Sequence, residues 1–413
     1  MPRVAKTSIV VNRLSTEQQN AIELCCDLSN TIVGVTGGAG TGKTLVLGHV
    51  YNELQTRGVS VVLCAPTGRA AKRVQELTGI TAKTIHRLLE FPMPDEFEEI
   101  DPEFINEPRR RKGNPFIEKV VIVDESSMIG PTLFRQLMDA LDKGAVVRFF
   151  GDNNQLPPVE EGTPPFIDIL SRFPSIELDF NFRSDDAIVS NAMRILSGRI
   201  PERNRQFEIH YAEYPLQAML QMVTKDFAHD DCQIIMPTRK GKYGTMRINP
   251  SLQMRFNGKG PLLLLDRYDE DEAKLVIRKR DKFLWVRNDY KLEMFNGEIG
   301  EVDSIDIEDG SFKLRMQDRL VEVPARMKTF SPYHQHVIDY DPRKQLELGY
   351  AITTHKSQGS EFHTIIYCIA KGQAWLLNRR NFYTAVTRAK KHVIIVTDRR
   401  AMGLSMKKHE ASK

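Results

Sequence analysis

The stretch "GGAGTGKT", residues 37–44, lies directly after the apolar run "TIVGVT" and directly before "LVLGHVYNEL", which has a helical pattern. Its spacing is GxxxxGK[ST], the pattern of a phosphate-binding loop between a strand and a helix. Glycines let the backbone turn until successive N–H groups face phosphate oxygens, and the helix adds its positive dipole end. We therefore predict a nucleotide phosphate site. Its residues are Gly38, Ala39, Gly40, Thr41, Gly42, Lys43 and Thr44.

Two side chains of this loop suit a magnesium-bound triphosphate. Lys43 places a compact charge on the β and γ phosphates, and the Thr44 hydroxyl is a natural Mg²⁺ ligand. Further along the chain, an apolar run at 120–123 ends in Asp124 and Glu125, and a buried strand of an α/β sheet presents such acids at the ligand-binding edge. We predict that Asp124 holds Mg²⁺ through water and that Glu125 orients or deprotonates the attacking water. The pattern indicates an NTPase.

Composition bounds the class of protein. The 413 residues are 41% hydrophobic, enough for two or three domains with sizeable cores. Basic residues number 58 against 54 acidic ones, but residues 379–413 hold ten Lys or Arg and only two acids. This uneven distribution is compatible with a polyanionic partner.

The cysteines and the hydropathy pattern exclude several classes. Five cysteines, at 25, 26, 64, 232 and 368, show no CxxC or Cys/His spacing. They predict buried thiols in a reducing compartment and no zinc or cluster site. No stretch approaches the roughly 18 apolar residues of a membrane span, and the N-terminus lacks a secretory apolar region. We expect a soluble, cytoplasmic protein.

Apolar runs alternate with helical patterns along most of the chain. The strand-like runs are "TIVGVTG", "VSVVLCAPT", "KVVIVDE", "AVVRFFGD" and "SIELDF", followed more weakly by "CQIIMPT", "HTIIYCIA" and "HVIIVTD". This alternation predicts α/β domains with doubly wound parallel sheets. Between 256 and 344 the pattern changes to short alternating strands, with turns at "FNGEIG" and "IEDGS", which is typical of a small β-barrel.

Nine short motifs follow one another in the order found in one helicase family. They are "LSTEQQNAI", "GGAGTGKT", "APTGRAAKRV", "TAKTIHRLL", "VDESSM", "GDNNQLPPV", "LDFNFRS", "YAITTHKSQGSEF" and "NFYTAVTRAKK". The chain thereby resembles superfamily 1B helicases of the RecD-like and Dda-like branch, from residue 14 to about residue 397. Its compact size is similar to the Dda type, so both a bacterial and a phage-encoded origin stay open.

The resemblance implies an architecture and domain boundaries. Two RecA-like domains are expected, with a small pin insertion in the first and an SH3-like β-barrel insertion in the second. The implied bounds are 1–89 and 118–185 for the first motor domain, 90–117 for the pin, 186–255 and 346–413 for the second motor domain, and 256–345 for the β insertion.

The resemblance also implies nucleotide contacts from both domains. The Gln18 amide would read N6 and N7 of adenine, and Phe182 would lie against the ring. Arg388 would act as an arginine finger from the second domain. The other implied nucleotide contacts are Gln155 and Arg183 at the γ phosphate, and Glu361.

Single-stranded DNA is the implied partner. The implied DNA-binding residues are Pro66, Thr67, Thr84 and His86 from the first domain, and Thr354, His355 and Lys356 from the second. Hydroxyl, imidazole and backbone N–H groups that contact phosphates give affinity without sequence preference. Sequence-independent tracking along one strand is expected.

The segment between the fourth and fifth motifs is Pro-rich, polar and longer than an ordinary connection. In the family this position holds the pin that meets the duplex fork. The candidates to stack on the end base pair are Phe91, Phe97, Phe104 and Phe116. No regular hairpin is legible here, so a surface loop remains the alternative.

We therefore predict an ATP- and Mg²⁺-dependent DNA helicase, active as a monomer on single-stranded, tailed and forked DNA. Its 5′ to 3′ polarity comes from the resemblance alone, and replication or recombination proteins are candidate partners. Two alternatives remain open. One is a RecD-like motor subunit of a nuclease complex, and the other is a single-strand translocase that displaces proteins without unwinding.

Overall fold

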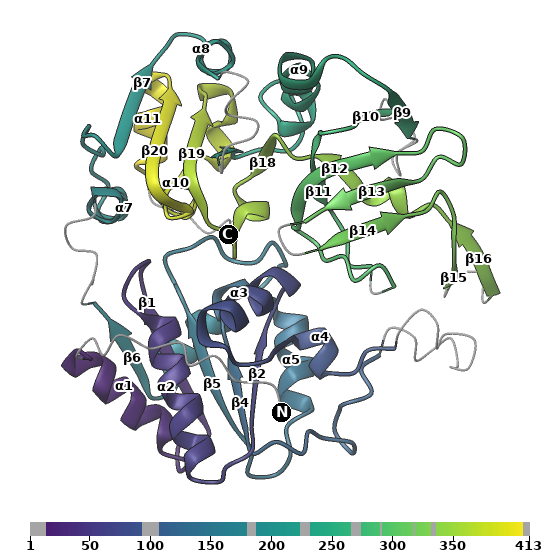
Figure 1. Cartoon of the computed structure of the whole chain (residues 1–413). Helices are drawn as coiled ribbons and strands as arrows, with labels where there is room; N and C mark the ends of the chain where they lie inside the picture. The colour runs from purple at the N-terminus through teal and green to yellow at the C-terminus, as the bar shows by residue number, and fades with distance from the viewer. Residues whose placement is uncertain are drawn as a thin grey trace, which may run out of the picture.

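The computed structural model contains two parallel β-sheets, one above the other, with a smaller antiparallel sheet beside the second (Figure 1). The structure describes residues 14–92, 107–179, 187–223, 232–265, 274–289, 291–316, 319–331 and 336–407. Within these ranges no helix is long and apolar enough to cross a membrane.

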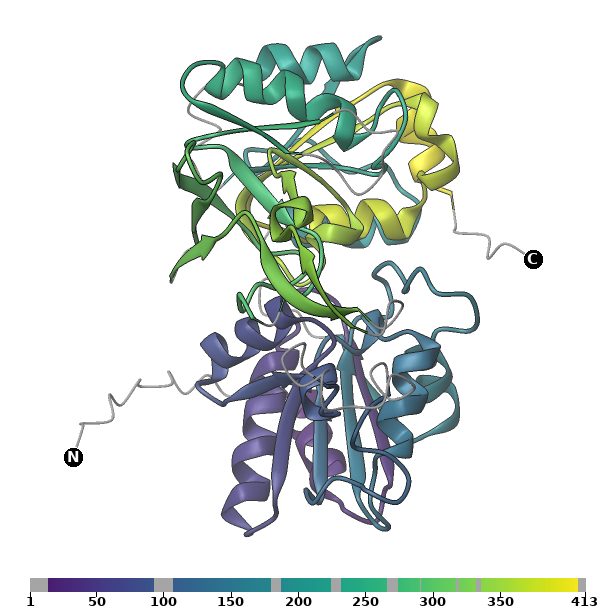
Figure 2. The same ribbon diagram turned by 90° about the vertical axis from the view of Figure 1, so that its right-hand side faces the viewer.

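The first sheet has six parallel strands in the order β3-β2-β4-β5-β1-β6. The strands are β1 Ile32–Gly37, β2 Val61–Ala65, β3 Ala82–Thr84, β4 Val120–Val123, β5 Val146–Gly151 and β6 Ser175–Leu178. The helices are α1 Thr16–Cys26, α2 Lys43–Thr56, α3 Gly68–Thr78, α4 Ile85–Leu88, α5 Pro131–Asp139 and α6 Pro165–Arg172, with a 3₁₀ turn at Ser126–Met128. Figure 2 shows helices on both faces of this sheet.

The central strands of the first sheet are buried on both faces, because apolar side chains occupy most of their positions. In β5, Val146 and Phe150 join the apolar cluster beneath α1 and α2, while Val147 and Phe149 join the cluster on the opposite face. Successive side chains of a strand point to opposite faces, so a continuous apolar run supplies both clusters.

The second sheet has five parallel strands in the order β18-β8-β19-β20-β7. The strands are β7 Phe207–Tyr211, β8 Cys232–Met236, β18 Ala351–Thr353, β19 Phe362–Ile369 and β20 Ala389–Thr397. The helices are α7 Ala187–Leu196, α8 Pro215–Met222, α9 Thr245–Asn257, α10 Arg379–Val386 and α11 Arg399–Ser405, with 3₁₀ turns at His355–Ser357 and Lys371–Leu376.

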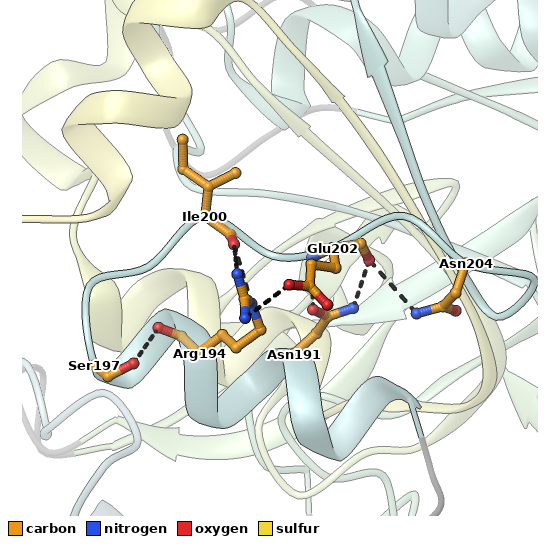
Figure 3. Close-up of polar contacts among 6 residues, drawn as sticks. All are labelled: Asn191, Arg194, Ser197, Ile200, Glu202 and Asn204. Atoms are coloured by element: carbon orange, nitrogen blue, oxygen red, sulfur yellow. Dashed lines mark hydrogen bonds and ion pairs between the residues drawn. The ribbon is translucent and has the colours of Figure 1, made fainter.

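The edge strand β7 is positioned by the chain segment that joins it to α7 (Figure 3). The Asn191 amide donates to Glu202 O at 2.8 Å and accepts from Glu202 N at 2.7 Å. Arg194 donates to Ile200 O and pairs with the Glu202 carboxylate at 2.9 Å. These bonds hold residues 200–202 against the helix, so β7 enters the sheet at a fixed position.

Antiparallel strands lie between α9 and β18. A five-stranded sheet has the order β14-β13-β12-β11-β17, and two hairpins, β9-β10 and β15-β16, accompany it. The bounds are β9 Leu262–Leu265, β10 Leu275–Arg278, β11 Lys282–Trp285, β12 Ile299–Ile305, β13 Phe312–Arg315, β14 Leu320–Val323, β15 Met327–Ser331, β16 His336–Tyr340 and β17 Leu346–Leu348, with a 3₁₀ turn at Pro342–Gln345.

A buried carboxylate joins this insertion to the second sheet. Asp281 is fully buried and accepts hydrogen bonds from the Gln253 amide, the Asn257 amide at 2.7 Å and the Tyr350 hydroxyl at 2.8 Å. Burial raises the pKa of Asp281. Because the donors come from α9 and from the approach to β18, one side chain anchors both chain crossings.

The predicted α/β class with parallel sheets is confirmed, and a β insertion does interrupt the second sheet. The eight strand-like runs all contain strands, whereas the pattern missed the short or edge strands β3, β7 and β18. The five cysteines are free and buried as predicted, and burial raises the pKa of Cys25 and of Cys368 to about 12. The SH3-like class of the insertion and the domain bounds stay predictions.

An arginine lies in the middle of the first core. Arg148, in β5, is fully buried, and its guanidinium donates to Cys25 O at 2.6 Å, Asp27 O at 2.9 Å and Asn30 O at 2.9 Å. These carbonyls belong to the C-terminal end of α1 and the loop after it. Arg148 therefore satisfies helix-end acceptors that would otherwise be buried without donors.

We predict that Arg148→Met lowers the free energy of unfolding by about 2–4 kcal/mol, because several buried carbonyls lose their donor. Chemical denaturation followed by circular dichroism measures the change. The control is Arg172→Met, which removes an exposed arginine of α6 and should change stability by less than about 0.5 kcal/mol. Equal effects of the two substitutions would contradict the structural role of Arg148.

Candidate nucleotide and nucleic-acid sites

The glycine-rich loop follows β1 and ends where α2 begins. Gly40 and Gly42 both have φ of 83°, a left-handed conformation that favours glycine. The N-cap Gly42 offers no side chain to the first-turn N–H groups of α2. The Lys43 ammonium lies over the loop and donates to Gly37 O at 2.7 Å and to Gly38 O at 2.9 Å. The predicted phosphate residues therefore form a turn with a cation above it and a helix dipole behind it.

The acids reach the same edge of the sheet because β4, β5 and β1 are adjacent and parallel. Asp124 follows β4 and Asp152 follows β5, while the phosphate loop follows β1. The carboxyl ends of neighbouring parallel strands share one edge. The sheet order thus brings together the loop and two carboxylates that are far apart in sequence.

Asp124 is a strongly perturbed acid. Burial, followed by the charge of Glu125, raises the pKa of Asp124 to about 7, while the Glu125 N–H and the Lys43 charge act in the opposite direction. Glu125 itself has φ of 50°, a left-handed conformation that is uncommon for a residue with a side chain. A perturbed carboxylate beside a strained one is a frequent property of catalytic sites.

Gln18 lies beside the phosphate loop but uses its amide within the protein. It is 1% exposed, its Oε1 accepts from Ser15 N at 3.2 Å, and its Nε2 donates to Thr41 O at 3.1 Å. Gln18 therefore completes the N-terminal capping box of α1 and supports the loop. Contact with adenine would require an exchange of these bonds, and this role stays a prediction.

Helix α10 of the second sheet meets the first sheet at this edge. The Tyr383 hydroxyl donates to Asp152 Oδ2 at 2.7 Å and accepts from Ala39 N at 3.2 Å. One residue further, the Thr384 hydroxyl accepts from Leu156 N at 2.9 Å, and Gln358 donates to Leu156 O at 3.0 Å. We refer to these contacts, together with those of α3 described below, as the seam between the two sheets.

Gln155 lies within the seam. Its amide nitrogen is 3.4 Å from Asp152 Oδ2, and its Oε1 is buried and has no hydrogen-bond partner among the described residues. The amide therefore has unused hydrogen-bonding capacity close to the phosphate loop.

Arg388 and Glu361 are bonded elsewhere in this arrangement. We refer to the first parallel sheet with its helices as the first unit, and to the second parallel sheet with its helices and the β insertion as the second unit. Arg388 is 5% exposed and donates to Thr384 O at 3.1 Å and Ser360 O at 3.4 Å, both within the second unit. The Glu361 carboxylate pairs with Arg73 of α3 and lies 3.9 Å from Lys390. The contacts of Glu361 tie it to α3 and β20, and the nucleotide roles of both residues stay predictions.

Two of the DNA-binding candidates in the first unit cap helices. Pro66 and Thr67 follow β2, and Thr67 accepts from Ala70 N at the start of α3. Thr84 accepts from Arg87 N at the start of α4. Caps of this kind hold the helix ends, and the backbone beside them, at the same edge of the sheet as the phosphate loop.

His86 lies in α4, half buried against Phe91, with ring centroids 5.2 Å apart. Burial lowers the pKa of His86, which favours the neutral ring. A neutral imidazole contacts a phosphate by donating a hydrogen bond rather than by charge.

The candidates in the second unit surround the turn after β18. Thr354 is fully buried and donates to Asn381 Oδ1 at 2.7 Å, so it supports the turn from beneath. His355 and Lys356 follow, and burial lowers the pKa of each. The Lys356 ammonium donates to Asn296 Oδ1 at 2.5 Å, which joins this turn to the β insertion.

The loop of Phe295, Asn296 and Gly297 also contacts α3. Arg69 donates to Gly297 O at 2.9 Å, and a Cβ on Gly68 would lie 2.4 Å from Phe295 Cγ. Gly68 is therefore required for this close approach. The start of α3 and the turn at Lys356 therefore both contact the same loop of the insertion. Among the candidate DNA-binding residues, Pro66 and Thr67 directly precede α3, and Lys356 contacts this loop itself.

Four predicted residues, Phe97, Phe104, Phe182 and Arg183, lie outside the described residues. Phe91 is half buried against His86 and remains a wedge candidate. Phe116 does not fit that role, because it is 2% exposed within the core of the first unit. The sequence signal failed there because an aromatic after a Pro-rich segment does not reveal which core it fills.

The sequence and the fold match known families. A family model described as an AAA domain matches residues 13–212, and the UvrD-like helicase C-terminal domain model matches residues 348–396. The computed structure superposes on the Pif1 helicase from Candida albicans with a TM-score of 0.62, at 19% identity over 96% of both chains. The likeness to that structure supports the fold alone.

Sequence relatives identify the family more specifically. The chain is 33% identical over 384 residues to the ATP-dependent RecD2 DNA helicase of Deinococcus radiodurans, a match that covers 91% of this chain. It is also 36% identical over 133 residues to the ATP-dependent DNA helicase dda of Enterobacteria phage T4, which covers 32% of this chain and 29% of that helicase. The chain belongs to the RecD-like and Dda-like helicases of superfamily 1B. It spans 48% of the length of the RecD2 helicase.

Sequence reasoning missed several polar residues that make contacts at the seam or beside it. They are Arg69, Arg73, Asp152, Asn296, Gln358, Tyr383 and Thr384. Asp152 had a usable signal, because it follows an apolar run as Asp124 does. The others lie within stretches quoted above, but their partners are far away in sequence, so the spacing of a motif does not show which contacts they make.

We predict that Asp124→Asn stabilises the nucleotide-free protein at pH 8 and has no such effect near pH 4. The folded protein retains the Asp124 proton between the ordinary pKa of 3.8 and about 7, so stability from this group falls as pH rises through that window. At pH 8 the variant should gain about 1 kcal/mol or more. Thermal unfolding across this pH range measures the difference.

The matched control is Asp168→Asn, which changes a partly exposed aspartate of α6 in the same way. A difference between Asp124→Asn and wild type that is constant with pH would show that Asp124 does not carry the proton.

Proposed function

We propose that this chain is an ATP-dependent DNA helicase that moves 5′ to 3′ along single-stranded DNA and unwinds duplex DNA ahead of it. The observation that carries the proposal is the seam at the phosphate loop. Tyr383 of the second unit contacts both Ala39 of the loop and Asp152 of the first unit. A nucleotide bound there lies between two units, so its binding and hydrolysis change how the units meet.

The residues around the loop suit ATP and Mg²⁺. Lys43 and the loop N–H groups would bind the phosphates, and Thr44 with Asp124 would hold Mg²⁺, which neutralises charge on the phosphate oxygens. The buried Asp124 carboxylate, with a pKa raised to about 7, fits a cation that restores its ionised form. Glu125 would orient and deprotonate the attacking water.

The remaining nucleotide roles belong to residues near the seam. Gln155 has unused hydrogen-bonding capacity there, which supports a role at the γ phosphate. Arg388 would complete the site as an arginine finger after leaving its present bonds to Thr384 O and Ser360 O. Gln18 and Phe182 would contact adenine, and Arg183 and Glu361 would complete the set.

Single-stranded DNA would cross both units near the loop at 295–297, which contacts both the start of α3 and the turn at Lys356. Pro66, Thr67, Thr84 and His86 would contact phosphates on one side, and His355 and Lys356 on the other, with Thr354 beneath them. Contacts to the backbone from two units that move relative to each other give directional movement without sequence preference. The relatives named above are DNA helicases, which supports DNA as the track.

Two alternatives are distinguished by simple measurements. A motor subunit of a nuclease complex would fail to unwind as a pure monomer, and a protein-displacing translocase would hydrolyse ATP on DNA without separating strands. We favour the autonomous monomer, and light scattering of the pure protein during an unwinding assay tests this choice.

We predict that Lys43→Ala and Glu125→Gln each reduce DNA-stimulated ATP hydrolysis by about 100-fold or more, because one removes phosphate charge stabilisation and the other removes the base. Phosphate release assays measure the rate. The matched controls are Lys143→Ala and Glu161→Gln, which change exposed residues in loops. Hydrolysis within two-fold of wild type in either site variant would contradict its role.

We predict that the protein unwinds a duplex with a 5′ single-stranded tail and leaves the same duplex with a 3′ tail intact. A fluorescence assay of strand release, with Lys43→Ala as the inactive control, measures both substrates. Unwinding from the 3′ tail would contradict the polarity, and hydrolysis without release from either tail would favour the translocase.

A further inference from the structure

One face of α10 is directed at the first unit. Arg380, Tyr383 and Thr384 are three and four residues apart, a spacing that places side chains on the same face of a helix. Tyr383 and Thr384 bond to Asp152, Ala39 and Leu156. The position of α10 therefore depends on the loops at the edge of the first sheet.

The Tyr383 hydroxyl is shielded from solvent, because the residue is 1% exposed. Its hydrogen bonds are therefore made to protein groups. A hydroxyl has one donor hydrogen, and here it goes to the Asp152 carboxylate at 2.7 Å. Burial raises the pKa of Tyr383 well above its ordinary value, so the hydroxyl keeps this hydrogen. Its oxygen accepts the Ala39 N–H. Both partners thus belong to the first unit.

Ala39 is part of the loop whose N–H groups face phosphate oxygens in a GxxxxGK[ST] sequence. A phosphate oxygen and the Tyr383 oxygen are both acceptors, and Ala39 has one backbone hydrogen. A Cβ on Gly38 would lie 3.2 Å from the Tyr383 hydroxyl, so the tyrosine is close to the loop at two successive residues.

We propose that Tyr383 is a phosphate-responsive positioning residue, whose hydroxyl and a bound triphosphate compete for the Ala39 N–H. The proposal rests on ATP being the nucleotide, as proposed above. When phosphate takes the N–H, Tyr383 loses one of its two anchors. Helix α10 then keeps its bonds to Asp152 and Leu156 and shifts more easily than before.

The shift has a consequence for Arg388, which follows α10 directly. The guanidinium bonds to Thr384 O, Ser360 O and the Thr387 hydroxyl. Two of these acceptors, Thr384 O and the Thr387 hydroxyl, belong to α10 or to its C-terminal end and move together with Arg388. Ser360 O lies outside the helix, so a movement of α10 changes the Arg388–Ser360 bond. Loss of the Tyr383 contact is thus the step that weakens the hold on Arg388 before it turns toward the nucleotide.

The test is Tyr383→Phe, which removes the hydroxyl and keeps the ring. Its matched control is Tyr350→Phe, because Tyr350 also donates to a buried carboxylate, Asp281, at 2.8 Å, but within the second unit. Both substitutions remove one buried bond between a tyrosine and an aspartate. Their thermal unfolding should therefore be similar, and differences in nucleotide binding report the position of Tyr383.

We expect a fluorescent, non-hydrolysable ATP analogue to bind Tyr383→Phe about five-fold more tightly than wild type without DNA, the factor of one neutral hydrogen bond. We also expect the ratio of ATP hydrolysis with and without single-stranded DNA to fall at least three-fold. Tyr350→Phe should match wild type in both measurements. Asp152→Asn, which weakens the second anchor of Tyr383, should tighten binding in the same direction and serves if Tyr383→Phe does not fold.

Unchanged or weaker binding of the analogue by folded Tyr383→Phe would overturn the competition, and a similar gain in Tyr350→Phe would show a general effect of lost hydroxyls. If wild type neither binds the analogue nor hydrolyses ATP, the proposed function itself fails, which is a separate result.

Discussion

Adjacent parallel strands that end at the same edge of a sheet are the constraint on which this site depends. In the order β4-β5-β1, Asp152 follows the strand next to that of the phosphate loop, and Asp124 follows the next strand beyond it. A different order would leave the same loop without carboxylates beside it. The buried apolar faces of these strands hold the order, because each strand supplies side chains to two apolar clusters. The chemistry at the edge is thus positioned by packing in the interior.

The fold was largely predictable because its central strands are mostly apolar, as in "KVVIVDE" and "AVVRFFGD", where Arg148 is the one charged residue inside a strand. The missed strands differ in physical terms. Strands β3 and β18 have three residues each, and β7 is an edge strand with alternating exposure. They are strands because a neighbour supplies their backbone partners, and bonds such as those of Asn191 to Glu202 bring β7 to that neighbour. Such contacts leave no periodic signal in the sequence.

The sequence predicted which residue types form the site, but it did not predict the hydrogen-bond partners of their side chains. The spacing of the glycine-rich loop and the acid pair specifies local chemistry, so their meeting at one edge followed from the sheet. Gln18 and Arg388 show the limit of prediction from motifs. Their motifs identify them, but the structure bonds Gln18 to Ser15 and Thr41, and Arg388 to carbonyls of its own unit. The rotamer of a side chain depends on partners from distant segments of the chain, which a motif does not identify. The guanidinium of Arg148 in the core likewise bonds to a distant residue, Cys25.

The seam differs in kind from the cores that it separates. In the described part of the chain, each apolar cluster of buried residues belongs to one unit, and none includes strands of both parallel sheets. The contacts across the seam are mainly hydrogen bonds and an ion pair, such as Tyr383 with Asp152 and Arg73 with Glu361. Each neutral bond contributes only about 0.5–1.5 kcal/mol net. Separating the units should therefore cost less free energy than disrupting either core, and we expect movement between the units to occur at the seam. In the proposed helicase, hydrogen bonds to a bound phosphate would replace seam bonds of similar strength, so a few of them would be sufficient to move one unit relative to the other.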